Sequence, residues 1–147
     1  MMLLDFKPCH EQEFYQMCRD FFASPAVCHQ IKEEDMKTTF QLALKGSPYL
    51  RGLVMAENDD IVGYLLLSFT YSNEVGGMVV WIEELYVKEP YRNRGYGKEA
   101  LKWIMNEYQQ NTKRFRLEVT EENEGAKKLY RSFGFQMLSY QQMTLEP

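Results

Sequence analysis

Cysteine is scarce in this chain, and its arrangement excludes two classes of small protein. The three cysteines, Cys9, Cys18 and Cys28, are odd in number and show no C-x-x-C spacing, which argues against a disulfide framework or a zinc finger. Cys9 and Cys28 each precede a histidine, but adjacent Cys-His dipeptides do not have the ligand spacing of structural zinc sites. We therefore expect reduced thiols and no bound metal.

The chain also has no long uninterrupted apolar run. Polar residues break every such run well short of the length that crosses a bilayer, so no membrane contact is expected. The opening residues, MMLLDFKP, lack the basic-then-apolar order of a secretion signal. Together with the reduced thiols, these absences predict a soluble cytoplasmic protein.

An excess of positive charge is missing as well. The 147 residues carry 17 Lys and Arg against 21 Asp and Glu, which gives a formal net charge of -4. Because phosphate backbones are bound by an excess of basic residues, nucleic acid is not expected as a partner.

What the chain does have is enough apolar residues for one core. It is 45% hydrophobic and 14% aromatic, which suits a single domain over residues 1–147. Apolar residues recur at helical spacing over residues 14–22 and again over residues 36–44. The pattern therefore predicts two helices in the first third of the chain.

Strands and helices then follow in an order that predicts a mixed sheet. Alternation with period two indicates strands, and the polar residues Asn58, Asp59 and Asp60 form the turn of a hairpin between the first two. A strand, a helix and a strand in succession make a crossover unit whose strands lie parallel. The expected strands cover residues 49–57, 61–71, 78–87, 115–119 and 135–145, and two further helices cover residues 97–111 and 125–133. The fold class predicted is α/β (α+β), with helices around one mixed sheet.

The stretch EPYRNRGYGKEALKWI, residues 89–104, places glycines and basic residues at the start of a predicted helix. The first turn of a helix exposes unpaired N–H groups and carries a partial positive charge, so phosphate binds there readily. Arg92, Arg94 and Lys98 add formal positive charge at the same end. We interpret this stretch as an anion site. The alternative is that Gly95 and Gly97 only shape a turn and that the arginines are solvated.

Residues 95–100 also fit G-x-G-x-x-A, the dinucleotide fingerprint, with Glu118 as the acid for the ribose. In that fold the first glycine follows directly on the strand, whereas here residues 88–94 intervene. Too little chain remains to complete a doubly wound sheet. The dinucleotide interpretation therefore ranks below the one that follows.

Read as R-x-x-G-x-G, residues 92–97 resemble the coenzyme A pyrophosphate loop of the GNAT superfamily of acetyl-CoA-dependent N-acetyltransferases. Upstream, WIEELYVKEPYR resembles the family's central strand where it runs into that loop, and IVGYLLLSFTY before it looks like the polyamine acetyltransferases. The whole resemblance covers residues 49–145 of the chain. Downstream, the family's N-x-x-A-x-x-x-Y-x-x-x-G-F region is matched by Asn123, Ala126, Tyr130, Gly134 and Phe135.

The resemblance implies a GNAT-type fold, in which a central mixed, mostly antiparallel sheet with a splayed pair of parallel strands is flanked by about four helices. It implies acetyl-CoA as cosubstrate, with its pyrophosphate on the amides of residues 93–98 and its pantetheine arm along the end of the central strand. The residues expected to bind acetyl-CoA are Leu85, Tyr86, Val87, Arg92, Asn93, Arg94, Gly95, Tyr96, Gly97, Lys98, Asn123 and Tyr130.

Acetyl transfer also needs a group that receives a proton from the amine. Alkyl amines have a pKa of about 10 and are mostly protonated at neutral pH, so a carboxylate is needed to hold the ammonium and to relay its proton away. Glu83 and Glu84 are adjacent on the central strand, and alternation puts them on opposite faces unless a bulge intervenes. One of them is then expected to face the acceptor. By likeness to the polyamine enzymes we choose Glu83 as the catalytic carboxylate; the alternative is a solvent-facing side chain in an ion pair.

Tyr130 is the expected catalytic acid. A phenol with a pKa of about 10 is able to protonate a thiolate whose conjugate acid has a pKa of about 8.5. The alternative is core packing, because Leu129, Tyr130 and Phe133 lie at helical spacing. Asn123 is expected to bond the amide groups of the coenzyme or to cap the helix that follows, and both roles can coexist.

These residues predict an N-acetyltransferase that moves an acetyl group from acetyl-CoA to a primary amine of a small molecule, of polyamine type by the narrower likeness. The alternative function is a non-catalytic acyl-CoA-binding sensor or partner module. Glu33, Glu34 and Asp35 suggest a cationic acceptor, unless they only favour the start of a helix. The exposed final strand would allow a homodimer by pairing between subunits.

Overall fold

The computed structural model describes all residues, 1–147, and its centre is a five-stranded sheet. Each strand is hydrogen-bonded to the next one along the chain, and all pairs are antiparallel except the last, β4 with β5, which is parallel. The strands are β1 (Met2–Asp5), β2 (Leu50–Glu57), β3 (Asp60–Ser72), β4 (Gly77–Val87) and β5 (Arg114–Leu117). The predicted mixed sheet with one parallel crossover is confirmed.

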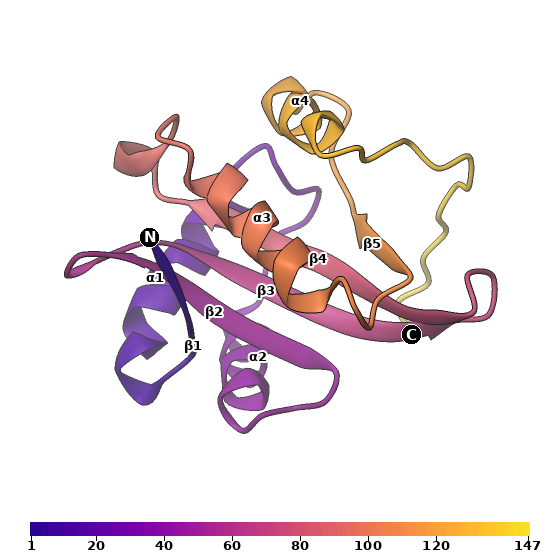
Figure 1. Cartoon of the computed structure of the whole chain (residues 1–147). Coiled ribbons are helices and arrows are strands. Elements are labelled where there is room, and N and C mark those ends of the chain that lie inside the picture. Colours follow the sequence, from indigo (N-terminus) through magenta and orange to yellow (C-terminus); the bar gives the residue numbers. More distant parts are fainter.

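Helices cover both faces of the sheet (Figure 1). Helices α1 (Glu11–Phe22) and α2 (Glu33–Leu44) lie on one face, and α3 (Tyr96–Tyr108) and α4 (Glu124–Ser132) lie on the other. Two short 3₁₀ turns, η1 (Pro8–His10) and η2 (Glu89–Tyr91), precede α1 and α3. All four helices confirm those expected from the apolar spacing, within a few residues at each end.

Each face of the sheet carries its own part of the core. Between the sheet and helices α1 and α2, aromatic rings pack edge to face and in stacks. The ring centroid of Phe14 lies 5.1 Å from that of Tyr64 and 5.6 Å from that of Phe40. Such aromatic pairs add about 0.5 to 1.5 kcal/mol each beyond the area they bury. On the other face, the aliphatic side chains of β2, β3 and β4 pack against Leu101 and Ile104 of α3.

The structure differs from the sequence prediction at both ends of the chain, by one strand that was missed and one that is absent. The N-terminal strand β1 was not expected, because four residues are too few to show a periodic pattern; it is held by pairing with β2. The final strand expected over residues 135–145 is absent, and Met143 and Leu145 are almost fully exposed. The apolar residues there do not keep a strict alternation, since Met137 and Leu138 are adjacent. The dimer expected from pairing of this strand therefore loses its structural basis.

The parallel pair separates before β4 ends. Pairing of β4 with β5 runs from Val79 with Arg114 to Ile82 with Leu117 and stops there. Strand β4 continues to Val87, so the edge of residues 83–87 that faces away from β3 has no strand partner. The sheet is splayed at this point, as the resemblance implied.

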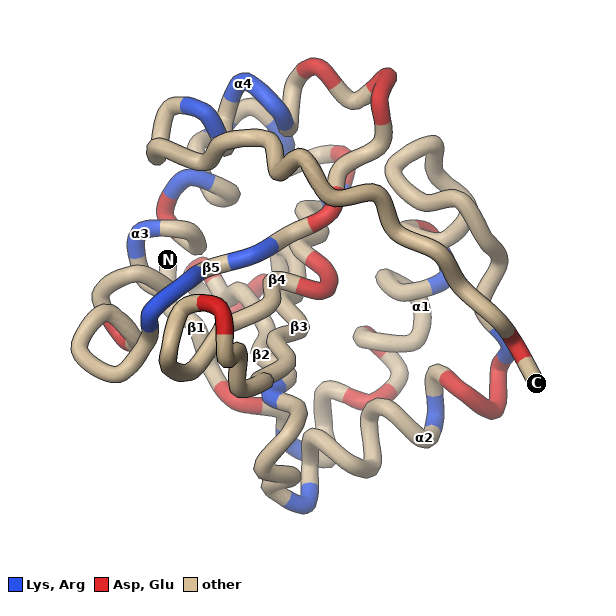
Figure 2. Tube along the Cα trace, turned by 90° about the vertical axis from the view of Figure 1, so that its right-hand side faces the viewer, with Lys and Arg blue, Asp and Glu red and all other residues tan.

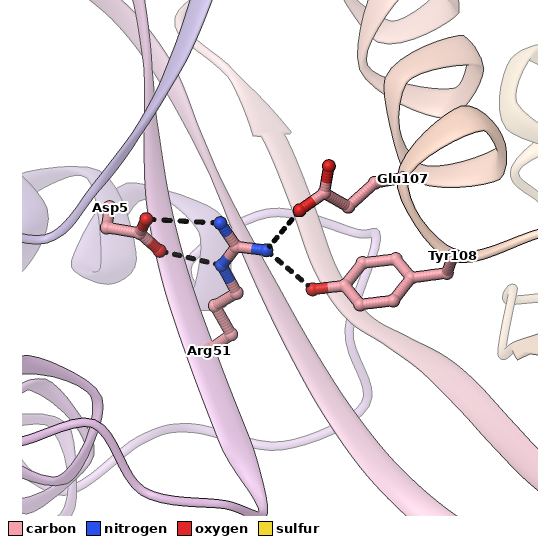
Figure 3. A network of polar contacts seen from close by, with 4 residues as sticks. All are labelled: Asp5, Arg51, Glu107 and Tyr108. Carbon is pink, nitrogen blue, oxygen red and sulfur yellow. Dashed lines mark hydrogen bonds and ion pairs between the residues drawn. The ribbon is translucent and has the colours of Figure 1, made fainter. Parts of the chain in front are cut away.

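A network around Arg51 ties the first strands to the end of α3 (Figure 3). The Arg51 guanidinium donates to both carboxylate oxygens of Asp5, at 2.7 and 3.1 Å, and to the Glu107 carboxylate at 3.0 Å. It also donates to the Tyr108 hydroxyl at 2.8 Å and lies over the Trp103 ring. The hydrogen bond from Arg51 holds the pKa of Asp5 below its ordinary value.

Arg51→Lys is expected to lower the free energy of unfolding by about 1 kcal/mol, because an ammonium cannot reproduce the paired contacts of the guanidinium fork. Since the folded-state pKa of Asp5 is lowered, its contribution is present above the ordinary pKa of about 3.9 and is lost as the pH falls through the folded value. Urea unfolding of the wild type and of Arg51→Lys at pH 7 and at pH 3 measures this effect. The difference between their free energies of unfolding should be smaller at pH 3. An equal difference at both pH values would contradict the role of Asp5.

Candidate active site

The loop before α3 offers a row of unused backbone donors. None of the N–H groups of residues 93–98 donates a hydrogen bond to the rest of the protein. Asn93 and Gly95 adopt left-handed conformations, with φ of 61° and 89°, and these turns carry the chain from η2 into the first turn of α3. The free amides and the positive end of the helix together form a cradle, here the backbone of residues 93–98, whose chemistry suits an anion.

Basic side chains stand beside this cradle in a chain that is acidic overall (Figure 2). Arg92 Nε donates to the backbone oxygen of Val87 at 3.0 Å, which folds its guanidinium over the Tyr86 ring at the end of β4. Arg94 lies over the Tyr91 ring. Arg92 is thereby placed between the cradle and the splayed end of the sheet.

A cavity of about 460 Å³ opens at that splayed end. Its walls come from the end of α1 and the connection after it, from the end of β4, from the first turn of α3 and from α4. The predicted site residues that it brings together are Leu85, Tyr86, Val87, Arg92, Gly97, Asn123 and Tyr130. Five others, Asn93, Arg94, Gly95, Tyr96 and Lys98, belong to the adjoining cradle and do not line the cavity, and neither does Glu83.

Some wall residues were missed by sequence reasoning. Phe21, Ser24, Pro25 and Ala26 come from the end of α1 and the segment after it, where the sequence carries no motif. They reach the cavity only through the packing of α1 on the sheet. Leu129, on α4, was noted in the sequence only as a possible core residue.

Tyr130, on α4, is one of the residues that line this cavity. It is largely buried, and burial raises the pKa of its phenol above the ordinary value. The hydroxyl therefore keeps its proton at neutral pH, as a proton donor must. The centroid of its ring lies 6.0 Å from that of Phe135, so Tyr130 also takes part in packing.

Asn123 caps α4. Its side-chain oxygen accepts a hydrogen bond from the Ala126 N–H at 3.2 Å, which satisfies one of the unpaired donors of the first turn. The structure thus bears out the capping alternative. The side-chain NH₂ group is not used in the cap and remains available at the cavity wall.

A β-bulge changes the expectation for the two adjacent glutamates. On β3, Leu66 pairs with Glu84 but Leu67 pairs with Ile82, so Glu83 is an extra residue in β4. As a result both carboxylates face one side: Glu84 accepts a hydrogen bond from the Tyr64 hydroxyl and Glu83 accepts one from the Ser68 hydroxyl. Tyr64 and Ser68 alternate onto the same face of β3. The two glutamates therefore lie on the same face of the sheet, which is the arrangement expected from the sequence only if a bulge intervenes.

The two carboxylates differ in environment. Glu83 is exposed, whereas Glu84 is largely buried. Burial raises the pKa of Glu84 to about 7, with a further contribution from the neighbouring Glu83 charge, against the lowering effect of the Tyr64 hydrogen bond. Glu84 therefore changes its charge near neutral pH.

The acidic cluster at the start of α2 is partly neutralised. Glu33 makes a two-point contact with Arg19 of α1, at 2.6 and 3.0 Å. Glu34 and Asp35 are exposed in the first turn of α2, where their charges favour the helix. Of this cluster, Glu33 is therefore already paired within the protein.

No cysteine or histidine is among the residues that line the cavity. All three cysteines are free; Cys9 and Cys28 are exposed, and Cys18 is buried in α1. His10 is buried, and its Nδ1 accepts a hydrogen bond from the Lys7 N–H at 3.1 Å. No group of three or more potential metal-ligating side chains occurs. No helix combines the length and the apolar character that a bilayer crossing requires.

Comparison with known sequences supports the family suggested by the motifs. The model of the acetyltransferase (GNAT) family matches residues 12–135. The spermine/spermidine N(1)-acetyltransferase of Bacillus subtilis is 28% identical over 92 residues, which cover 60% of this chain and 60% of that enzyme. The thialysine N-epsilon-acetyltransferase of Mus musculus is 28% identical over 138 residues, 86% of this chain and 79% of that enzyme. The match thus spans about three fifths of the Bacillus enzyme's length.

Solved structures share the fold at low sequence identity. A possible acetyltransferase from Clostridium difficile superposes with a TM-score of 0.84 at 19% identity, over 99% of this chain and 97% of that one. The aminoglycoside acetyltransferase AAC(6')-Iy, solved with a bisubstrate analogue of coenzyme A and acetylneamine, superposes with a TM-score of 0.80 at 13% identity, over 99% and 97% of the two chains. With a family model that matches most of its length, this chain belongs to the acetyltransferase (GNAT) family.

Proposed function

We propose that this protein transfers an acetyl group from acetyl-CoA to a primary amine of a small molecule. The observation that carries the proposal is the row of unused amides at residues 93–98, which adjoins a cavity at the splayed end of the sheet. Two of the similar enzymes are named for acetylating spermine and spermidine or thialysine, all of which are amines. An acceptor of polyamine type is therefore the first to test.

The residues present fit acetyl-CoA. The amides of Asn93 to Lys98 and the Arg92 guanidinium suit its diphosphate, because both are donors to anionic oxygens. The free edge of β4 at residues 85–87 offers backbone groups to the amides of the pantetheine arm. The side-chain NH₂ of Asn123 is an additional donor in the cavity wall. Bound acetyl-CoA would supply the acetyl group already activated as a thioester.

The chemistry follows from the charges near the cavity. Glu83, exposed at the point where β4 leaves β5, holds the acceptor ammonium by charge and begins the removal of its proton. A backbone N–H near Leu85 polarises the thioester carbonyl, a type of stabilisation worth about 3 kcal/mol elsewhere. Tyr130 gives its proton to the leaving sulfur. Direct attack by the amine needs no acyl-enzyme, so sequential kinetics are expected.

A thiol-release assay over spermine, spermidine, thialysine, aminoglycosides and amino acids tests the proposal directly. Acetyl-CoA-dependent release of coenzyme A with at least one amine supports it. Calorimetric binding of acetyl-CoA without release over the whole panel would instead indicate a coenzyme-binding module without turnover. Thermal protection by NAD or ATP in place of coenzyme A would favour the dinucleotide interpretation.

Arg92→Glu is expected to raise the Kd for coenzyme A about thirtyfold, or about 2 kcal/mol, because it replaces a donor at the diphosphate site by a negative charge. Isothermal titration calorimetry measures the effect. Lys45→Glu, the same charge change at an exposed residue that follows α2, is the matched control and should leave the Kd within twofold. An analogue without the diphosphate, acetyl-pantetheine, should bind both variants alike. Equal losses for coenzyme A and acetyl-pantetheine would contradict the assignment of Arg92.

A further inference from the structure

The bulge in β4 creates a pair of carboxylates with separate partners. The side chains of Glu83 and Glu84 both lie on the face of the sheet that α1 and α2 cover, and each accepts one hydrogen bond from a hydroxyl of β3. They are the first two residues of β4 beyond its last pair with β5, immediately before the edge of residues 85–87 that lines the cavity. At about 3.3 Å per residue along a strand, Glu84 lies within about 7 Å of the cavity wall at Tyr86.

Glu84 lacks the positive partner that buried carboxylates usually have. Its hydrogen bond, at 2.5 Å, comes from the hydroxyl of Tyr64, which is fully buried. The other titratable groups that face it are the Cys18 thiol from α1 and the Glu83 carboxylate from its own strand. By contrast, Glu13 pairs with Lys88 and Glu33 pairs with Arg19. A structural role alone would be served better by such a pair, because an unpaired buried charge is costly.

The environment of Glu84 suits a group that gains and loses a proton in each cycle. Burial and the charge of Glu83 raise its pKa, the Tyr64 hydrogen bond lowers it, and the outcome is about 7. A base is most effective when its pKa lies near the working pH. Glu83, by contrast, is exposed to solvent. The pair therefore offers one exposed carboxylate to hold the acceptor ammonium and one buried carboxylate to take up its proton, two tasks that a single carboxylate performs poorly.

We propose that Glu84 is the final acceptor of the amine proton, which Glu83 passes on to it, and that the Tyr64 hydroxyl is the positioning group that holds Glu84 in readiness. This assignment rests on the proposed acetyltransferase function. The acceptor ammonium loses one proton through Glu83 to Glu84, and Glu84 releases it to water after the cycle. The new N–C bond forms as the C–S bond breaks. Tyr130 gives its proton to sulfur, and the second proton that nitrogen loses as the amide forms returns, through water, to the Tyr130 phenolate, so the net products are the amide, the thiol and the one proton released by Glu84.

The pH profile of kcat/KM tests this division of tasks. The wild-type protein should show an acidic limb with a midpoint near pH 7. The ionisation of the amine itself lies near pH 10, about three units away, so the two limbs are resolved. Glu84→Gln keeps an acceptor for the Tyr64 hydroxyl and should lose the limb, with kcat/KM about a hundredfold lower at pH 8.

Two substitutions on β3 form a matched pair. Tyr64→Phe removes the hydrogen bond that lowers the pKa of Glu84, so the limb should move upward by about one pH unit. Ser68→Ala removes the corresponding hydrogen bond to Glu83 and should leave the midpoint of the limb in place. Thermal unfolding of each variant confirms that it is folded before its profile is measured.

The outcomes separate the inference from the function on which it rests. A limb that persists in Glu84→Gln, or that moves with Ser68→Ala and not with Tyr64→Phe, would overturn the role of Glu84 while leaving an active acetyltransferase. A wild-type protein that releases no coenzyme A with any amine would instead overturn the proposed function. Loss of the limb in Glu84→Gln together with its upward shift in Tyr64→Phe supports the inference.

Discussion

Tyr130→Phe is expected to lower kcat about a hundredfold while the Kd for acetyl-CoA changes less than twofold. The substitution removes one oxygen from a largely buried ring and leaves the ring's contact with Phe135, so binding and packing are retained. The leaving thiolate then takes its proton from water, which is not held in place. Steady-state kinetics and calorimetry on the same preparation separate the two effects.

Tyr71→Phe is the control for Tyr130→Phe. Tyr71 is an exposed residue near the end of β3, away from the cavity, and its loss of a hydroxyl should not change kcat. A faster leaving group offers a second check: the defect of Tyr130→Phe should shrink when the thiol of the acyl donor is more acidic. If Tyr130→Phe kept the wild-type rate across the pH range, Tyr130 would not be the acid.

Gly63→Ala is expected to lower the free energy of unfolding by about 3 kcal/mol. A Cβ at this position would lie 2.2 Å from the backbone oxygen of Tyr86 and 2.7 Å from Met55 Cε. The Met55 side chain is able to move, but the Tyr86 oxygen belongs to the neighbouring strand. The methyl group therefore forces β3 and β4 apart where Gly63 pairs with Val87.

Gly125→Ala is the matched control for Gly63→Ala. Gly125 lies in the first turn of α4, and a Cβ there meets nothing within 4 Å. Alanine in a helix is favoured over glycine, so this variant should be as stable as the wild type or more stable by up to about 1 kcal/mol. Urea unfolding followed by circular dichroism compares the three proteins. Equal midpoints for the two variants would show that β3 and β4 are able to separate at little cost.

Gly63→Ala should also weaken coenzyme binding. The strand displaced by the methyl group is the one whose residues 85–87 line the cavity. For Gly63→Ala that is folded at 15 °C, we expect acetyl-CoA to raise the unfolding temperature by less than it does for the wild type. A normal shift would indicate that the end of β4 keeps its place when its pairing with β3 is strained.

Local patterns were sufficient for the parts of the molecule that are local in origin. The cradle at residues 93–98 was predicted because glycines, arginines and a helix start stand next to one another in the chain. The cap by Asn123 was predicted for the same reason. The helices followed from a periodicity repeated over several turns.

Features that depend on partners distant in the chain were not accessible in this way. The pairing of Glu83 and Glu84 on one face arises from a bulge, which is defined by the register of β4 against β3. Alternation along β4 alone gave opposite faces. Strand β1 likewise exists only through its pairing with β2. Ser24 and Ala26 reach the cavity because α1 packs on the sheet, and no residue pattern signals it.

The three cysteines differ in what a reagent in water can reach. Cys9 and Cys28 are exposed, whereas Cys18 is buried on the side of α1 that packs on the sheet, and burial raises the pKa of its thiol to about 12. Because the thiolate is the reactive form, alkylation of Cys18 has to wait until α1 lifts from the sheet. The rate at which Cys18 is alkylated therefore reports how often the aromatic core between α1 and the sheet opens.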